Sequence, residues 1–247
     1  MGKRDDYRAT LRTLKEWDAF LLKESGLPGP RGNLELAQAV ADEGDEALFR
    51  RYLSFTPEQA PTNSPEEFLA FCGVAGLGRL LAEGKRDVLD TLRRQASDPR
   101  WRTREGVAMA LQRWGEVDMD ALLREMGTWS AGNPLEQRAA AAALCEPHLL
   151  REDRHAAKVL QILDRITASI QSREERKSDE FKALRKGLGY CWSVAVAALP
   201  EQGKQAMEGW SSSGNADVRW IMKENLKKDR LARMDAAWVE RWRRPPA

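Results

Sequence analysis

Apolar residues recur along most of the chain at spacings of three and four, the period that gathers side chains on one face of an α-helix. Leu11, Leu14, Trp17, Leu21 and Leu22 show this period near the start of the chain. Sustained alternation of Val, Ile, Thr and aromatic residues is almost absent, and no Asn-Gly or Asp-Gly hairpin turn occurs. The pattern therefore predicts an all-α fold.

Residues that break helices punctuate this pattern at regular intervals. Ser64-Pro65-Glu66-Glu67 offers an N-cap, a proline at the first helical position and acids in the first turn. From these breaks we predict about twelve helices of roughly 10–20 residues joined by short loops. The main breaks are Gly26–Asn33, Thr56–Pro65, Asp98-Pro99, Ala131–Pro134 and Ser211–Asn215.

Four segments of the chain resemble one another when they are aligned on an arginine. These arginines are Arg104, Arg138, Arg185 and Arg219, and their spacings are 34, 47 and 34 residues. Two positions later stand mostly small residues: Gly106, Ala140, Gly187 and Ile221. A unit of this length is two helices and two turns, and it cannot bury its apolar face alone.

The repeat pattern resembles that of HEAT repeats, in which polar residues near an arginine connect successive turns. We therefore predict a HEAT-like helical-repeat solenoid (an α-α superhelix), with an irregular helical bundle as the alternative. The expected organisation is a single domain over 1–247, with less regular helices over 1–63 and repeats over 64–244. Gly73, Gly76 and Gly78 have the wrong spacing for a dinucleotide loop, and we expect them to allow close helix packing.

The charge distribution is compatible with a nucleic-acid partner but does not by itself indicate one. Net charge is +2, which is no global nucleic-acid signature. Locally, residues 79–104 hold eight basic and four acidic residues, and residues 219–244 hold nine and four. These two segments are basic stripes on a nearly neutral protein.

Other features of composition argue against metals, membranes and disulfides. Cys72, Cys145 and Cys191 lie far apart among apolar neighbours, which favours buried free thiols and a reducing, cytoplasmic location. With two histidines, His148 and His155, and no Cys-x-x-Cys, we expect no metal and no cofactor, and cap or surface roles for the histidines. No apolar run is long enough to cross a bilayer, and the N-terminus does not read as a signal peptide.

Three short motifs resemble those of AlkD-like DNA alkylpurine glycosylases, which are themselves HEAT-like solenoids. Trp129-SAGNPLEQ-Arg138-AAAAAL resembles that family's W…N-x-W-x-x-R-A-A helix. Asp179-EFKALRKGLG-Tyr190 is similar to its E-F-x-x-Q-K-A-I-G-W helix, and Trp114-Gly-Glu-Val-Asp118 to its W-x-x-V-D motif. The resemblance covers about residues 100–225. This chain departs from the family in having Leu135 for an aromatic residue, Tyr190 for tryptophan, and a carboxylate about one helix closer to the arginine.

The resemblance implies a set of roles. Asp118 would be the catalytic carboxylate facing the deoxyribose C1′, and Trp114 and Tyr190 would offer π faces to a cationic purine and its sugar. Arginines would hold backbone phosphates. These are Arg100, Arg102, Arg104, Arg138, Arg185 and Arg219.

Each of these residues also has a structural interpretation. Asp118 or Asp120 suits the N-cap of a helix, and Trp114 the end of a helix core. Tyr190 and Trp192 suit packing, and Arg138 a tie within its repeat. Tryptophans interleaved with arginines, in Arg100-Trp101-Arg102 and in Arg241-Trp242-Arg243-Arg244, suit either an interface or an inward-turned ring.

Function is predicted as binding. The leading hypothesis is a scaffold, non-catalytic or catalytically degenerate, that binds duplex DNA on its concave face. One alternative is a DNA glycosylase that excises cationic alkylated purines, and the other is a protein–protein adaptor. The partners left open are thus duplex DNA and a protein.

Overall fold

The computed structural model describes residues 2–243, and the chain divides into two compact units, residues 1–117 (unit 1) and 118–247 (unit 2). The boundary falls inside the segment 64–244 that was predicted as one run of repeats. The single-domain organisation stays a prediction, and each unit is described here by itself.

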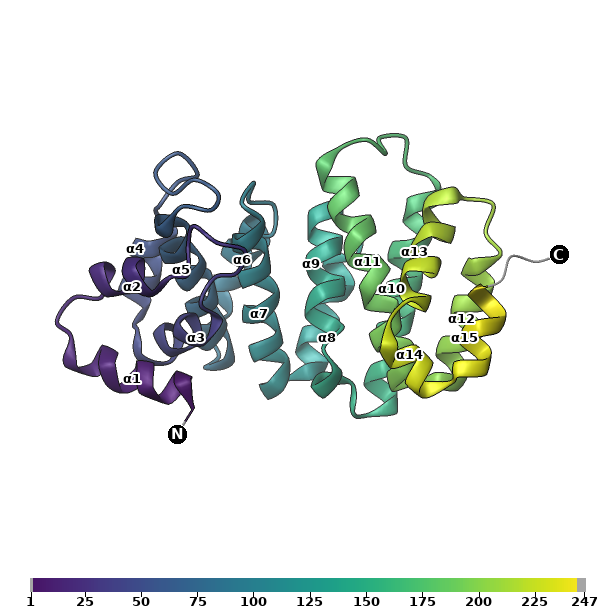
Figure 1. The fold of residues 1–247 in the computed structure, drawn as a ribbon, viewed down its shortest axis with the longest axis horizontal. Helices are drawn as coiled ribbons and strands as arrows, with labels where there is room; N and C mark the ends of the chain where they lie inside the picture. Colours follow the sequence, from purple (N-terminus) through teal and green to yellow (C-terminus); the bar gives the residue numbers. More distant parts are fainter. Residues whose placement is uncertain (1, 244–247) are drawn as a thin grey trace. The chain divides into compact units, whose positions relative to one another are not determined.

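The described residues contain α-helices and no strand, which confirms the predicted all-α class (Figure 1). Unit 1 holds α1 (Lys3–Thr13), α2 (Asp18–Glu24), α3 (Leu34–Glu43), α4 (Glu46–Leu53), α5 (Pro65–Ala82), α6 (Leu89–Gln95) and α7 (Trp101–Val117). Unit 2 holds α8 (Met119–Trp129), α9 (Pro134–Leu144), α10 (Asp153–Gln171), α11 (Asp179–Ala198), α12 (Pro200–Ser211), α13 (Ala216–Leu226), α14 (Asp229–Met234) and α15 (Ala236–Arg243). Short 3₁₀ turns lie at Arg86–Val88 and Pro147–Leu150.

The predicted count of about twelve helices is wrong, because residues 2–243 contain fifteen. Several helices are shorter than expected and end without glycine or proline. Between α14 and α15 the break is made by Asp235, whose Oδ1 accepts a hydrogen bond from the amide of Trp238 at 2.9 Å. A side-chain cap of this kind competes with the helix for backbone donors and can end one helix and start another.

The apolar run near the N-terminus spans two helices rather than one. Leu14 leaves α1 in an extended conformation, with φ −91° and ψ 137°. Trp17 Nε1 donates to the carbonyl of Leu11 at 3.0 Å, taking the acceptor that a continuing helix would give to the amide of Lys15. Leu11 and Leu21 still reach the core, while Trp17 stays half-buried at the break.

Helix α5 is the centre of unit 1, since α2, α3, α4, α6 and α7 all pack against it. It starts as predicted, with Ser64 Oγ accepting from the amide of Glu67 at 3.4 Å. A Cβ at Gly73 would lie 2.9 Å from the carbonyl oxygen of Phe49 in α4, and one at Gly78 would lie 2.5 Å from Cα of Ala110 in α7. The glycines therefore permit close helix packing, as the sequence predicted.

Unit 2 is built in two layers of helices. Helix α11 packs between α9 and α13, and α10 contacts α8 and α12 in the second layer. Helices α11 and α13 run parallel. Their contacts show this direction, because a residue further along α11 contacts a residue further along α13. Arg185 lies 3.2 Å from Asp217, and the amide of Ser193 donates to Asn225 at 2.7 Å. Trp129 and Trp192 are buried in this core.

The four aligned arginines occupy corresponding places, in the N-terminal halves of α7, α9, α11 and α13. Arg104 and Arg219 each donate to the carbonyl six residues upstream, Asp98 at 2.5 Å and Ser213 at 2.7 Å. The glycines two positions after an arginine face the helix that lies two places earlier in the chain, α5 for Gly106 and α9 for Gly187. A Cβ at Gly106 would lie 3.1 Å from Phe71 of α5, and one at Gly187 3.3 Å from Arg138 of α9. The aligned arginines thus share a position within their helices, and the solenoid arrangement stays a prediction.

Candidate nucleic-acid interface

Asp118 is the N-cap of α8. Its Oδ1 accepts a hydrogen bond from the amide of Ala121 at 2.9 Å, and the residue is half-buried. Of the two roles weighed for it, the capping role is therefore confirmed. The catalytic role stays a prediction.

Trp114 belongs to unit 1 and is 3% exposed. The guanidinium of Arg86 lies 4.6 Å from its ring centroid. These contacts are those of a core residue at the end of a helix, the structural alternative given above. A ring that is buried and covered by a cation does not offer an open face to a purine.

Arg100 is turned inward in unit 1, and its predicted role toward DNA phosphates stays a prediction. It is 3% exposed, and its Nε and Nη2 donate to the two carboxylate oxygens of Asp98 at 2.9 and 2.7 Å. Its Nη1 donates to the carbonyl of Phe55 at 3.0 Å. Each terminal nitrogen is thus already engaged within the unit.

Arg102 is likewise turned inward and 5% exposed, and its predicted role toward DNA also stays a prediction. Its Nη1 donates to the fully buried Glu67 at 2.9 Å, and its Nη2 donates to the carbonyl of Gly29 at 2.6 Å. The amide of Gly29 donates in turn to Asn63 Oδ1 at 3.0 Å. Arg102 therefore ties the glycine- and proline-rich loops at 26–33 and 56–65 to α5 and α7, because a buried guanidinium needs acceptors on every side.

The remaining predicted arginines are half-buried. Arg104 and Arg219 hold the loop carbonyls described above. Arg185 pairs with Asp217 and stacks on Trp220 with 4.0 Å from its guanidinium carbon to the ring centroid. The side chain of Arg138 packs beside Gly187 of α11. Their contacts fit repeat ties, and their role toward DNA stays a prediction.

Tyr190 lies at the surface of unit 2 and is 45% exposed, so packing, the alternative weighed for it, does not describe it. Arg230 donates to its hydroxyl, and the guanidinium carbon of Arg230 lies 4.7 Å from the ring centroid. The ammonium of Lys228 is 5.8 Å from the same centroid. Trp192 is instead fully buried, and its Nε1 donates to Thr167 at 3.0 Å.

Two lysines extend this surface along α11. Lys182, Lys186 and Tyr190 are four residues apart, which places them on one face of the helix, and all three are exposed. Lys182 pairs with Asp179 at 2.9 Å, whereas Lys186 makes no ion pair in residues 2–243. We call Lys182, Lys186, Tyr190, Lys228 and Arg230 the Tyr190 surface. Sequence reasoning picked out Tyr190 alone, although Lys228 and Arg230 lie in the basic stripe 219–244.

The arginine-flanked tryptophans divide between the two interpretations given for them. Trp101 is 41% exposed, and the guanidinium of Arg102 lies 4.3 Å from its ring centroid. Trp242 is half-buried, and Arg243 Nη2 donates to the carbonyl of Leu226 at 2.7 Å. Arg244 lies outside the described residues.

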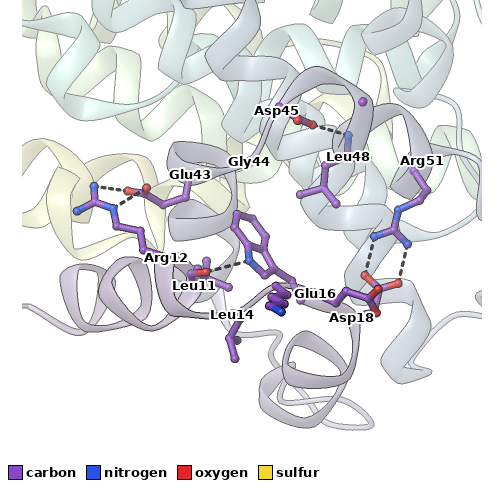
Figure 2. A pocket seen from close by; sticks show the side chains of 13 residues that line it. Leu11, Arg12, Leu14, Glu16, Asp18, Glu43, Gly44, Asp45, Leu48 and Arg51 are labelled. Atoms are coloured by element: carbon purple, nitrogen blue, oxygen red, sulfur yellow. Dashed lines mark hydrogen bonds and ion pairs between the residues drawn. The ribbon is translucent and has the colours of Figure 1, made fainter.

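Unit 1 also has an open hollow of about 720 Å³ between the α1–α2 and α3–α4 connections (Figure 2). Leu11, Trp17 and Leu48 supply its apolar lining. Its charged rim is paired within the protein: Arg12 bonds to Glu43 at 2.8 Å, and Arg51 bonds to Asp18 at 2.6 Å. These four side chains are therefore already paired within the protein.

The histidines and cysteines take structural positions. His148 Nδ1 lies 3.2 Å from Glu146 at the surface, whereas His155 is buried, 3.6 Å from Asp120, so the surface or cap role predicted for both holds for His148. All three cysteines are free and buried, as predicted. Within residues 2–243 no group of three His, Cys, Asp or Glu side chains is arranged to hold a metal ion, and none of the helices there is long and apolar enough to cross a membrane.

Comparison with known proteins adds little to these observations. The chain matches no protein-family profile and no curated protein. It is similar to an engineered protein whose crystal structure was solved by the Northeast Structural Genomics Consortium, with 14% identity over 95% of this chain and 98% of that one, and a TM-score of 0.37. Similarity at that level supports no inference about function, so the Tyr190 surface has to be interpreted from its own chemistry.

Proposed function

We propose that the chain is a HEAT-like solenoid whose unit 2 binds the sugar-phosphate backbone of duplex DNA through the Tyr190 surface, without chemistry on the bases. The observation that carries this proposal is the exposed ring of Tyr190 with Arg230 and Lys228 against it and Lys186 one turn away. Four basic side chains in one patch attract a polyanion. Within the described residues a carboxylate pairs with Lys182, whereas Lys186, Lys228 and Arg230 have no carboxylate partner.

The contacts of Tyr190 favour recognition of charge over recognition of bases. The guanidinium of Arg230 lies over the ring of Tyr190 and also donates a hydrogen bond to its hydroxyl. The ring and the hydroxyl of the tyrosine therefore both position this guanidinium. A guanidinium held in this way is suited to a phosphate, which it can bind through two parallel hydrogen bonds. Contacts of this kind fix a protein on DNA and carry no sequence information.

The solenoid part of the proposal rests on unit 2. Helices α9, α11 and α13 form one layer, and each carries an aligned arginine in its N-terminal half. Regular stacking of this type produces an extended face with one side chain pattern repeated along it. The α11 part of that face bears Lys182, Lys186 and Tyr190.

The test is a titration of the full chain with a short random-sequence duplex at several salt concentrations, followed by fluorescence anisotropy. The logarithm of affinity is expected to fall linearly with the logarithm of salt concentration, with a slope of about −0.9 for each phosphate contacted. The double variant Lys186→Gln/Arg230→Gln should bind more weakly and with a shallower slope. Lys158→Gln, on an exposed position of α10, is the matched control and should behave as wild type.

Two results would contradict the proposal. One is an affinity that does not depend on salt, which would favour the adaptor alternative. The other is equal binding by wild type and the double variant.

A further inference from the structure

A second polar cluster in unit 2 joins the end of α10 to the turn between α8 and α9. Arg165, Ser169 and Arg173 follow one another at intervals of four residues, and they contact Ser130 and Gln137 across the turn. Arg165 Nη1 lies 3.3 Å from Ser130 Oγ, and Arg173 Nη2 donates to Gln137 Oε1 at 2.8 Å. We call these five residues the Arg173 cluster.

The two guanidinium groups contact groups that are themselves connected. Gln137 is 2% exposed, and its Nε2 donates to the carbonyl of Ser130 at 2.8 Å. This bond fixes the amide so that its oxygen is the atom that faces Arg173. Ser169 Oγ lies 3.3 Å from the same Nε2 and donates to the carbonyl of Ile166 at 2.8 Å. The cluster is therefore organised without a ligand, which reduces the entropy lost on binding.

The positive charge of this cluster is not compensated. Neither Arg165 nor Arg173 makes an ion pair with a carboxylate within residues 2–243. Arg173 Nε is buried and has no hydrogen-bond partner, and burial lowers the pKa of Arg173. By contrast, Arg154 at the start of α10 pairs with Asp120 and Glu152 at 2.9 and 2.7 Å.

A partly buried guanidinium without an anion raises the free energy of the folded state, because its lost hydration is not replaced. A phosphate group would supply the missing charge and accept from several nitrogens at once. We propose that Arg165 and Arg173 form a phosphate-binding site, with Gln137 and Ser169 holding the two guanidinium groups apart and oriented. The site shares no residue with the Tyr190 surface and does not depend on the function proposed for that surface.

The test measures the thermal unfolding midpoint of the full chain as inorganic phosphate replaces chloride at constant ionic strength. A ligand that binds only the folded state raises the midpoint with increasing concentration. Wild type is expected to show this rise, and Arg173→Gln to lose it. Without phosphate, Arg173→Gln should unfold at the same temperature as wild type or higher, because it removes an uncompensated charge.

Arg176→Gln is the matched control. Arg176 lies three residues further on, and its Nη1 is 3.7 Å from Asp217, a carboxylate that it shares with Arg185, so unlike Arg173 it has an acidic partner. This variant should keep the phosphate response. Dimethyl phosphate, titrated in parallel, distinguishes a backbone phosphodiester from a free phosphate: a response to both supports a backbone phosphate, and a response to inorganic phosphate alone supports the free ion.

The proposal is overturned if phosphate leaves the wild-type midpoint unchanged, or if Arg173→Gln responds as wild type does. Should Arg173→Gln fail to fold, Arg165→Gln decides the question, because Arg165 is exposed and its removal leaves the buried contacts in place. An undiminished phosphate response in Arg165→Gln would then also rule the site out.

Discussion

Two arginines of unit 1 and two of unit 2 are used in opposite ways. In unit 1, Arg100 and Arg102 are buried against Asp98 and Glu67. In unit 2, Arg173 and Arg230 have no carboxylate partner among the described residues, and they contact a glutamine and a tyrosine instead. The first arrangement stabilises loops, and the second leaves positive charge for a ligand.

This difference shows what a count of basic residues in a sequence can and cannot indicate. Residues 79–104 and 219–244 have similar excesses of basic residues. In the first segment, Arg100 and Arg102 meet acceptors contributed by Glu67, Asn63 and the loops, which lie far away in sequence. A guanidinium that is paired with a buried carboxylate is accessible neither to solvent nor to a phosphate group.

The largest expected effect comes from breaking the buried pair of unit 1. Arg102→Gln leaves Glu67 without a cation in the core, so the free energy of unfolding should fall by about 3–5 kcal/mol. Urea denaturation of the full chain measures this fall. Arg12→Gln, which removes one exposed partner of Glu43 while Arg8 still binds it, should change stability far less. Similar losses in both variants would remove the contrast between buried and exposed arginines.

A second prediction tests the opposite behaviour in unit 2. Arg230→Gln should leave the urea midpoint almost unchanged, since the side chain of Arg230 contacts Tyr190 at the surface of unit 2. It should reduce the slope of log affinity for duplex DNA against log salt by about 0.9, the value for one lost phosphate contact. Tyr190→Phe removes the hydroxyl contact but not the guanidinium, so its slope should stay at the wild-type value. A full loss of folding in Arg230→Gln would show that this arginine is structural, like those of unit 1.

The third prediction separates the two roles weighed for Asp118. Asparagine caps helices as well as aspartate, so Asp118→Asn should be nearly neutral, whereas Asp118→Ala should lose about 1 kcal/mol of stability. Thermal unfolding measures both variants. Release of 7-methylguanine from methylated DNA by wild type, abolished in the folded Asp118→Asn variant, would establish the glycosylase alternative in place of simple binding.

The smallest expected effect is a pH dependence from an exposed ion pair of unit 1. Hydrogen bonds from Arg51 outweigh burial and hold the pKa of Asp18 below its ordinary value of 3.8. Because the folded state keeps this carboxylate ionised more readily than the unfolded state, its stabilisation is complete above that value and is lost as the pH falls through the lower, folded pKa. Asp18→Asn should therefore unfold with a weaker acid dependence below about pH 4. Identical acid profiles for the two proteins would mean that Asp18 contributes nothing to this dependence.

The local pattern of the sequence determined the fold class and the start of helices such as α5. The period of apolar residues, the cap at Ser64 and the aligned arginines depend on neighbours within one or two turns, so they were visible without coordinates. The glycines of α5 and the burial of the three cysteines followed from the same reasoning. The number of helices could not be predicted in this way, because the breaks at Trp17 and Asp235 each depend on one side-chain hydrogen bond.

Only the tertiary structure decided which charged side chains face solvent. The sequence grouped Arg100 and Arg102 with Arg138 and Arg185, and it could not place Glu67 beside Arg102 across 35 residues. Nor could it bring Arg230 onto Tyr190 across 40 residues, or reveal that Arg173 has a glutamine where a carboxylate would balance its charge. Helix periodicity is a property of neighbours along the chain, whereas the hydration and pairing of a charge depend on every segment folded around it.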